Sequence, residues 1–370
     1  MRTSAAAPEA DASRGGVALL GREDHPTDAL EDYCKQLAHA LQTKGYSLGI
    51  SRIRWDEAGW PRALSDAEKR FAGRRGSWVL LQYTALAWSW RAFPLGFLRV
   101  IRRLKRAGLR ILIVFHDSGP YRGRPLIDGV RGRIQLAVIL RAARLAEKIV
   151  STTAPERVPW MQDPAILAKT LSIPIGSNLP VAPRKVPDQG THVPVIVVFG
   201  FSNLPAETAL IASVLRSAGN EVGPIHLTVF GRDGEAAGAL LRPLLEGSPV
   251  ELEDHGILEP ELAAGVLANA DVQLFIRSGF TSSRGSGIAG IVNGLPIVGF
   301  SDAETAFPIT EAGVRLVPLG DQQALERELI VVLKDRALRE SPRQRNLAAA
   351  ERYFSWDHIA DAYLSVLRTS

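Results

Sequence analysis

The sequence predicts an α/β protein with two doubly wound, Rossmann-like domains that face each other across a cleft. Short apolar runs alternate with helical patterns in both halves of the chain. Strands that are apolar throughout are typical of parallel sheets covered by helices on both faces. A proline-rich segment without periodicity, residues 181–193, separates the halves and predicts a linker. The 370 residues, of which 46% are hydrophobic, are enough for two cores.

The first half predicts an N-terminal domain over residues 16–180. Residues 1–15 include acidic side chains and no apolar run, so we expect a disordered leader there rather than a secretory signal. The expected helices include 29–44 and 94–107. The expected strands are 16–20, 47–53, 78–83, 110–115, 148–153 and 171–175.

The second half restarts the alternation and predicts a C-terminal domain over residues 194–350. A final helix within 351–370 is expected to cross back to the N-terminal domain. Doubly wound sheets bind ligands at the carboxyl ends of their strands, so we expect the site in the cleft between the domains. The expected strands are 194–199, 225–230, 249–253, 271–276, 295–300 and 314–317, and the expected helices are 205–218, 234–246, 259–269, 285–293, 321–335 and 343–353.

The composition excludes several classes of protein. The single cysteine, Cys34, excludes a disulfide framework and a cysteine-rich metal centre, and it fits a reducing compartment. No stretch of 18 residues is both apolar and uncharged, so we expect no membrane span and a cytoplasmic protein. The sequence has no Asp-x-Asp motif and no histidine spacing typical of a ligand set, so we expect neither a metal nor a cofactor.

Positive charge is concentrated in the first half of the chain. The net charge is +5, and residues 51–150 contain 21 Lys and Arg against 7 Asp and Glu. Such a concentration of positive charge attracts phosphorylated substrates or anionic lipid. The alternative interpretation is a solvated basic surface that binds no partner. No nucleic-acid-binding module accompanies the charge, so we expect no nucleic-acid partner. Within 88–110 the basic residues are interleaved with aromatic ones, which fits a helix on anionic lipid or a core helix with a basic outer face; the aromatic residues are Trp88, Trp90, Phe93 and Phe97.

An ordered series of short motifs runs through residues 255–300. It comprises a glycine turn, a helix that ends in Ala-Asp, a strand, a loop with Arg-Gly-Ser, a helix, and Gly-x-Pro before the next strand. These motifs are His255-Gly256, Ala270-Asp271, Ser283-Arg284-Gly285-Ser286 and Gly294-Leu295-Pro296. With weaker matches over roughly residues 16–368, the chain resembles GT-B glycosyltransferases. It is most similar to family 4 of the retaining enzymes, of the type that assembles bacterial polysaccharides.

The resemblance implies transfer of a sugar from a nucleotide diphosphate sugar to a glycan or to a polyprenyl-diphosphate-linked acceptor. It implies retention of configuration without a metal, with the leaving phosphate taking the acceptor proton. Members that use lipid-linked acceptors dock on membranes, so the resemblance also implies a peripheral location on the inner face of the cytoplasmic membrane.

The diphosphate of such a donor needs positive charge and free N–H groups. Gly285 and Ser286 open a predicted helix whose N-terminal amides can bind phosphate, and Arg284 beside them can form a bidentate contact. A capped helix with a surface arginine is the alternative interpretation. The resemblance adds further donor-site residues, which are Thr281, Gly200, Phe201, Ser202, Arg232 and Ile257.

The sequence departs from the family pattern at the donor site. The family carries two glutamates with seven residues between them in the binding loop, and Thr281 and Ala289 occupy those positions here. The family's Arg and Lys that hold the diphosphate follow the first strand of the second domain, whereas residues 200–207 contain neither. The first loop also lacks the usual Gly-Gly pair.

The resemblance places catalytic residues in the first domain. His116 ends the 110–115 strand, where a family histidine faces the donor sugar, and Asp117 could orient its ring or bind the acceptor. His25, Thr27 and Asp28 lie in the first loop, on the acceptor side. Alternatively, the His116 ring only forms hydrogen bonds within a turn at the strand end, and Thr27 or Asp28 caps the 29–44 helix.

Two other functions share this fold. A nucleotide-sugar 2-epimerase would use carboxylates in the cleft, which the missing glutamates argue against. A degenerate, non-catalytic GT-B domain that binds a glycan, a nucleotide or a partner enzyme agrees with the same absences.

Overall fold

The computed structural model describes residues 15–117, 119–121, 125–184 and 192–368. The chain forms two compact units. Unit 1 comprises residues 1–173 with 359–370, and unit 2 comprises residues 174–358. Apart from Gly15, the expected leader lies outside the described residues, as do residues 185–191 of the expected linker.

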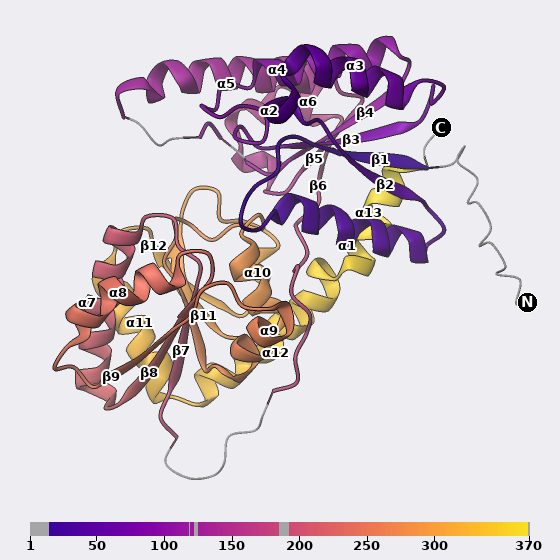
Figure 1. Cartoon of the computed structure of the whole chain (residues 1–370). Coiled ribbons are helices and arrows are strands. Elements are labelled where there is room, and N and C mark those ends of the chain that lie inside the picture. The colour runs from indigo at the N-terminus through magenta and orange to yellow at the C-terminus, as the bar shows by residue number, and fades with distance from the viewer. Residues whose placement is uncertain (1–14, 118, 122–124, 185–191, 369–370) are drawn as a thin grey trace, which may run out of the picture. The chain divides into compact units, whose positions relative to one another are not determined.

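Unit 1 is built on a six-stranded parallel sheet with the strand order β2-β1-β3-β4-β5-β6. In Figure 1, α3, α4 and α5 cover one face of this sheet, and α1 and α13 cover the other. The strands are β1 (Gly16–Leu20), β2 (Leu48–Arg52), β3 (Trp78–Tyr83), β4 (Arg110–Phe115), β5 (Lys148–Ser151) and β6 (Thr170–Ser172). The α-helices are α1 (Ala29–Thr43), α2 (Trp55–Ala58), α3 (Trp60–Phe71), α4 (Leu95–Arg106), α5 (Pro125–Leu145), α6 (Pro164–Leu167) and α13 (Trp356–Leu367).

The core of unit 1 explains why its central strands are apolar. β3 and β4 lie between other strands and between two helix layers, and every residue of β3 is buried. On the α1 and α13 side, the Tyr33 and Tyr363 hydroxyls share a hydrogen bond of 2.8 Å, and Trp78 Nε1 donates to the Leu367 carbonyl at 3.1 Å. The last helix of the chain is therefore part of the packing of unit 1.

The aromatic residues that accompany the basic stretch of α4 divide between core and surface. Trp88 and Phe97 are fully buried, with ring centroids 4.8 Å apart. Of the two alternatives for this stretch, these two rings follow that of a core helix with a basic outer face, because the core of unit 1 encloses them. Trp90 and Leu95 remain exposed, at 62% and 55%.

Unit 2 repeats the architecture with the strand order β12-β11-β10-β7-β8-β9, again parallel throughout. Figure 1 shows α7, α8 and α11 on one face and α9, α10 and α12 on the other. The strands are β7 (Val195–Phe199), β8 (Ile225–Phe230), β9 (Val250–Asp254), β10 (Val272–Phe275), β11 (Ile297–Ser301) and β12 (Val314–Pro318). The α-helices are α7 (Leu204–Val222), α8 (Gly234–Leu245), α9 (Pro260–Asn269), α10 (Gly285–Val292), α11 (Gln322–Lys334) and α12 (Ala337–Ala349).

The two parallel six-stranded sheets with flanking helices confirm the predicted α/β class with two Rossmann-like domains. The expected helix over 343–353 differs in detail, because α12 begins at Ala337 and passes into a π-helical turn over Ala350–Phe354. None of the helices in the described ranges combines the length and the hydropathy needed to cross a bilayer.

Candidate functional site

The carboxyl edge of the unit 2 sheet has a topological switch point between β7 and β10. The chain leaves β7 through α7 on one face, and it leaves β10 through α10 on the other. Open α/β sheets bind ligands in the crevice formed where neighbouring strands diverge in this way. The loops after β7 and β10 are therefore the first place to look for a ligand site.

The loop after β7 brings its backbone close to that after β8. Gly200 has a φ of 73° and Gly231 a φ of 114°, and a Cβ atom on Gly231 would lie 3.2 Å from the Gly200 Cα. Both positions therefore require glycine. Ser202 follows, and its backbone N–H and hydroxyl donate to the two oxygens of buried Glu207 at 2.9 and 2.5 Å. This contact ties Ser202 to the first turn of α7. Phe201 is buried in the core beneath the loop.

The loop after β10 is held by β11 and by the residue that follows β11. The Phe280 N–H donates to the Phe300 carbonyl at 2.9 Å, and the Gly279 N–H donates to Asp302 Oδ2 at 3.1 Å. Thr281 is buried, and its hydroxyl lies 3.0 Å from the Ser283 hydroxyl. These bonds fix the approach of the chain to α10.

The first turn of α10 packs tightly under this loop. Phe280 is fully buried and stacks on Phe275 with ring centroids 4.7 Å apart. A Cβ atom on Gly287 would lie 2.3 Å from the Phe280 ring, so Gly287 is a packing requirement. Gly285 has more room, because the nearest atom to its Cβ position is Ile175 Cδ1 at 3.7 Å. Gly285 is also exposed, so a ligand can reach the backbone at the start of α10.

Arg284 occupies the N-cap position of α10. Its Nη2 donates to the Ser278 hydroxyl at 2.9 Å, whereas its Nε is shielded from solvent and has no hydrogen-bond partner in the described part of the chain. The Ser286 hydroxyl is likewise shielded and unpartnered among the described residues. The sequence-predicted phosphate residues thus lie together at one helix start, with polar atoms that form no hydrogen bond to the described residues.

Arg277 lies in the same loop and was not anticipated from the sequence. It follows β10 by two residues, and a Cβ atom on Gly200 would lie 3.3 Å from its Nη1. Burial lowers the pKa of Arg277, and the nearby positive charge of Arg284 lowers it further. The sequence offered one indication of this residue, namely an arginine just after a predicted strand.

The remaining donor-side residues lie at the ends of the neighbouring strands. Arg232 is exposed and follows Phe230 at the end of β8. Ile257 is 47% exposed and follows β9. β8 and β9 are the next strands beyond β7, so both residues share its carboxyl edge. Within the described ranges, no group of three or more His, Cys, Asp or Glu side chains gathers to hold a metal ion.

In unit 1, His116 lies directly after β4 and is partly buried. Its Nε2 lies 2.8 Å from Oε1 of the fully buried Gln82, so the ring donates to the amide oxygen. The Tyr33 ring meets it edge-on, with centroids 5.1 Å apart. Burial lowers the pKa of His116 to about 4, so the ring is neutral near pH 7. Asp117 follows it and is partly buried.

The loop between β1 and α1 carries the acceptor-side candidates. Asp28 is the N-cap of α1 and accepts from the backbone N–H groups of Leu30 and Glu31, each at 3.1 Å. It also forms a shielded ion pair of 2.9 Å with Arg52. His25 and Thr27 are exposed in the same loop. Asp28 thus has a capping role, and the binding roles of the three residues stay predictions.

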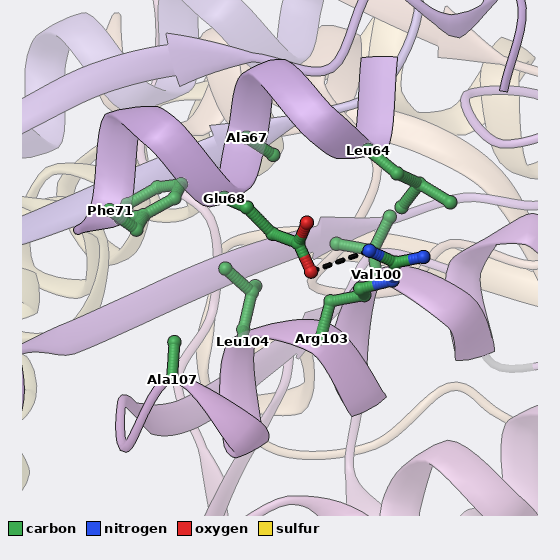
Figure 2. Close-up of a pocket in the computed structure, with 8 residues that line it drawn as sticks. All are labelled: Leu64, Ala67, Glu68, Phe71, Val100, Arg103, Leu104 and Ala107. Atoms are coloured by element: carbon green, nitrogen blue, oxygen red, sulfur yellow. Dashed lines mark hydrogen bonds and ion pairs between the residues drawn. The ribbon is translucent and has the colours of Figure 1, made fainter. Parts of the chain in front are cut away.

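A small pocket lies elsewhere in unit 1, between α3 and α4 (Figure 2). Its walls are mostly apolar, and Arg103 Nη1 and Glu68 Oε1 form an ion pair of 2.6 Å beside it. The two helices end shortly before β3 and β4 begin, so the pocket lies in the helix layer rather than at the carboxyl edge. It contains none of the candidate residues.

Comparison with known proteins identifies the fold. No protein-family model matches the sequence, and no curated protein sequence matches it at a significant level. The structure resembles sucrose-phosphate synthase from Thermosynechococcus elongatus, with a TM-score of 0.68 and 16% identity over 96% of this chain and 98% of that one. It also resembles Anabaena HepE, solved in complex with UDP and glucose, with a TM-score of 0.65 and 12% identity over 96% and 99% of the two chains.

A third similar structure is named as an epimerase and not as a glycosyltransferase or synthase. A putative UDP-N-acetylglucosamine 2-epimerase from Listeria monocytogenes matches with a TM-score of 0.61 and 11% identity over 96% of both chains. At these identities the similarities establish the fold alone. The chain has the GT-B fold, and its function depends on the residues at the site.

Proposed function

We propose that the protein is a glycosyltransferase that moves a sugar from a nucleotide diphosphate sugar to an acceptor. The observation that carries the proposal is the start of α10 at the switch point of unit 2, where Arg284 Nε and the Ser286 hydroxyl are both shielded and have no hydrogen-bond partner among the described residues. The similar HepE structure contains UDP and glucose, which agrees with a nucleotide site on this fold.

The proposed site suits the chemistry of the leaving group. Departure of a nucleoside diphosphate develops about two negative charges, which preorganised N–H donors and a guanidinium stabilise. The amides of Gly285 and Ser286 point along the dipole of α10, and Arg284 adds a full charge. We therefore propose that protein cations and backbone amides, rather than a metal or another cofactor, neutralise the diphosphate.

His116 suits a role beside the donor sugar. Positive charge builds on the sugar ring as the diphosphate leaves, and a neutral imidazole can hydrogen-bond a sugar hydroxyl without opposing that charge. The pKa of about 4 keeps His116 neutral, and the bond to Gln82 fixes its orientation. In this mechanism the leaving phosphate accepts the acceptor proton, and the sugar keeps its configuration.

The acceptor is proposed to be a glycan or a polyprenyl-diphosphate-linked sugar in surface polysaccharide assembly, met by the β1–α1 loop. The exposed arginines of α4, with Trp90 and Leu95, would hold unit 1 on the anionic inner face of the cytoplasmic membrane. A basic, solvated surface without a membrane partner is the competing interpretation.

A non-catalytic nucleotide- or glycan-binding protein is the second candidate. Thr281 stands where the family has a glutamate, and its hydroxyl is engaged with Ser283. Ser202 is engaged with Glu207, and residues 200–207 provide no Arg or Lys. This candidate predicts nucleotide binding without turnover.

The test is to measure sugar transfer and donor hydrolysis with a panel of UDP- and GDP-sugars. His116→Ala should lower turnover by about 10²-fold or more and change UDP affinity by less than about twofold. His226→Ala is a matched control, because His226 lies on β8 and pairs with the exposed Glu251. Absence of turnover by the wild-type protein with every donor would favour the non-catalytic candidate.

A further inference from the structure

In the part of the chain that the structure describes, the guanidinium of Arg277 has no partner that explains its position. Within the described ranges it forms no hydrogen bond or ion pair, and its Nε is shielded from solvent. Removing a cation from water without giving its donors acceptors is costly, and an arginine carries five N–H donors. An anion that is not part of the chain would supply those acceptors.

The carboxylates near Arg277 compensate only in part for its positive charge. Glu207 and Asp233 attract it electrostatically. Both oxygens of Glu207, however, accept from Ser202, at 2.9 and 2.5 Å. Asp233, at the N-cap position of α8, forms no ion pair with Arg277. The two carboxylates thus lower the cost of this partly buried charge, and none of the described residues accepts a hydrogen bond from its donors.

Arg284 adds a second positive charge to the same loop. The two guanidinium groups repel each other, and the Nε of each is shielded and has no hydrogen-bond partner among the residues that the structure describes. A ligand with one negative charge would relieve one of them, whereas an anion with two or more charges can relieve both. The amides at the start of α10 favour negative charge at the same place.

We infer that Arg277 is a diphosphate-binding residue, which forms with Arg284 a two-guanidinium site at the end of β10. The inference rests on the proposed function, because it takes the nucleotide diphosphate as the ligand. The loop after β7 contains no Arg or Lys, and Gly200 of that loop lies against Arg277 Nη1 instead. The positive charge missing from the β7 side is thus supplied across the switch point by β10.

The binding test is calorimetry with UDP, GDP and inorganic pyrophosphate. Arg277→Met should weaken all three by tenfold or more, about 1.4 kcal/mol, because they share only the diphosphate. Arg277→Lys should retain part of the affinity, because lysine keeps the positive charge but cannot form the bidentate contact of a guanidinium group. Arg242→Ala is the control, because it removes an arginine from the exposed face of α8 and should leave affinity within about twofold.

Thermal unfolding separates a binding role from a structural one. Without ligand, Arg277→Met should unfold at the same temperature as wild type or at a higher one, because it removes an unpaired charge. With UDP, its gain in melting temperature should be smaller than that of wild type. A lower melting temperature without ligand, together with unchanged diphosphate affinity, would show that Arg277 is structural and would overturn the inference.

The remaining outcomes distinguish this inference from the proposed function. Failure of the wild-type protein to bind any of the three diphosphates would also overturn it. Tenfold weaker binding by Arg277→Met in a protein that never transfers sugar would support the two-guanidinium site and reject only the transferase.

Discussion

Neutral His116 should make the stability of unit 1 depend on pH in a defined window. The unfolded chain protonates this histidine near pH 6.5, whereas the folded protein protonates it only near pH 4. Between these values the unfolded state binds more protons, so acidification favours unfolding. Well above pH 6.5 His116 is protonated in neither state, and its contribution to stability no longer changes with pH.

The size of the effect follows from the two pKa values. Their separation corresponds to about 3 kcal/mol of unfolding free energy, lost as the pH falls from 6.5 to 4. About 2 kcal/mol of this is already lost at pH 5. His116→Asn keeps a polar side chain and does not titrate, so its stability should fall less over the same window.

Tryptophan fluorescence during urea unfolding measures this difference. Six of the seven tryptophans belong to unit 1, and only Trp356 belongs to unit 2, so the signal reports mainly on unit 1. Loss of the Gln82 hydrogen bond should lower the unfolding free energy of the variant by a similar amount at each pH above 6.5. The contributions of the other titrating groups are the same in both proteins, so they cancel in the difference between the two unfolding free energies. Parallel stability curves for wild type and His116→Asn between pH 7 and pH 5 would refute the lowered pKa of His116.

Three further predictions concern the phosphate loop and the basic surface. Arg284→Ala should weaken UDP or GDP binding by about 1.5–3 kcal/mol, the loss of a charge-assisted contact, and unchanged affinity by calorimetry would remove Arg284 from the site. Gly287→Ala should destabilise unit 2 by about 1–3 kcal/mol, because its Cβ would meet the buried Phe280 ring, whereas Gly285→Ala should change stability by less than about 0.5 kcal/mol. Equal effects in urea unfolding would contradict that packing. Co-sedimentation with liposomes should rise with anionic lipid, fall with salt and weaken in Trp90→Ala, and binding indifferent to all three would leave the surface without a membrane role.

Local sequence patterns determined the strands and most helix boundaries. Strands enclosed between two helix layers are mostly apolar, so β3, β4 and β8 could be located from their runs of apolar residues. α1 begins where its capping aspartate, Asp28, predicts. α5 was not singled out, because its apolar residues are spread around the helix instead of forming one stripe.

Only the tertiary structure decided which side chains are available for chemistry. The sequence placed Asp28, Ser202 and Arg284 in loops at the carboxyl edges, but it could not show that Arg52, 24 residues away, binds Asp28 or that Glu207 holds Ser202. In the same way, packing enclosed Trp88 and left Trp90 exposed. Arg277 had no motif to identify it, and its significance appears only when β7 and β10, far apart in the chain, become neighbours. Hydrogen-bond partners and burial come from such distant contacts, whereas the helix and strand patterns depend on residues close in sequence.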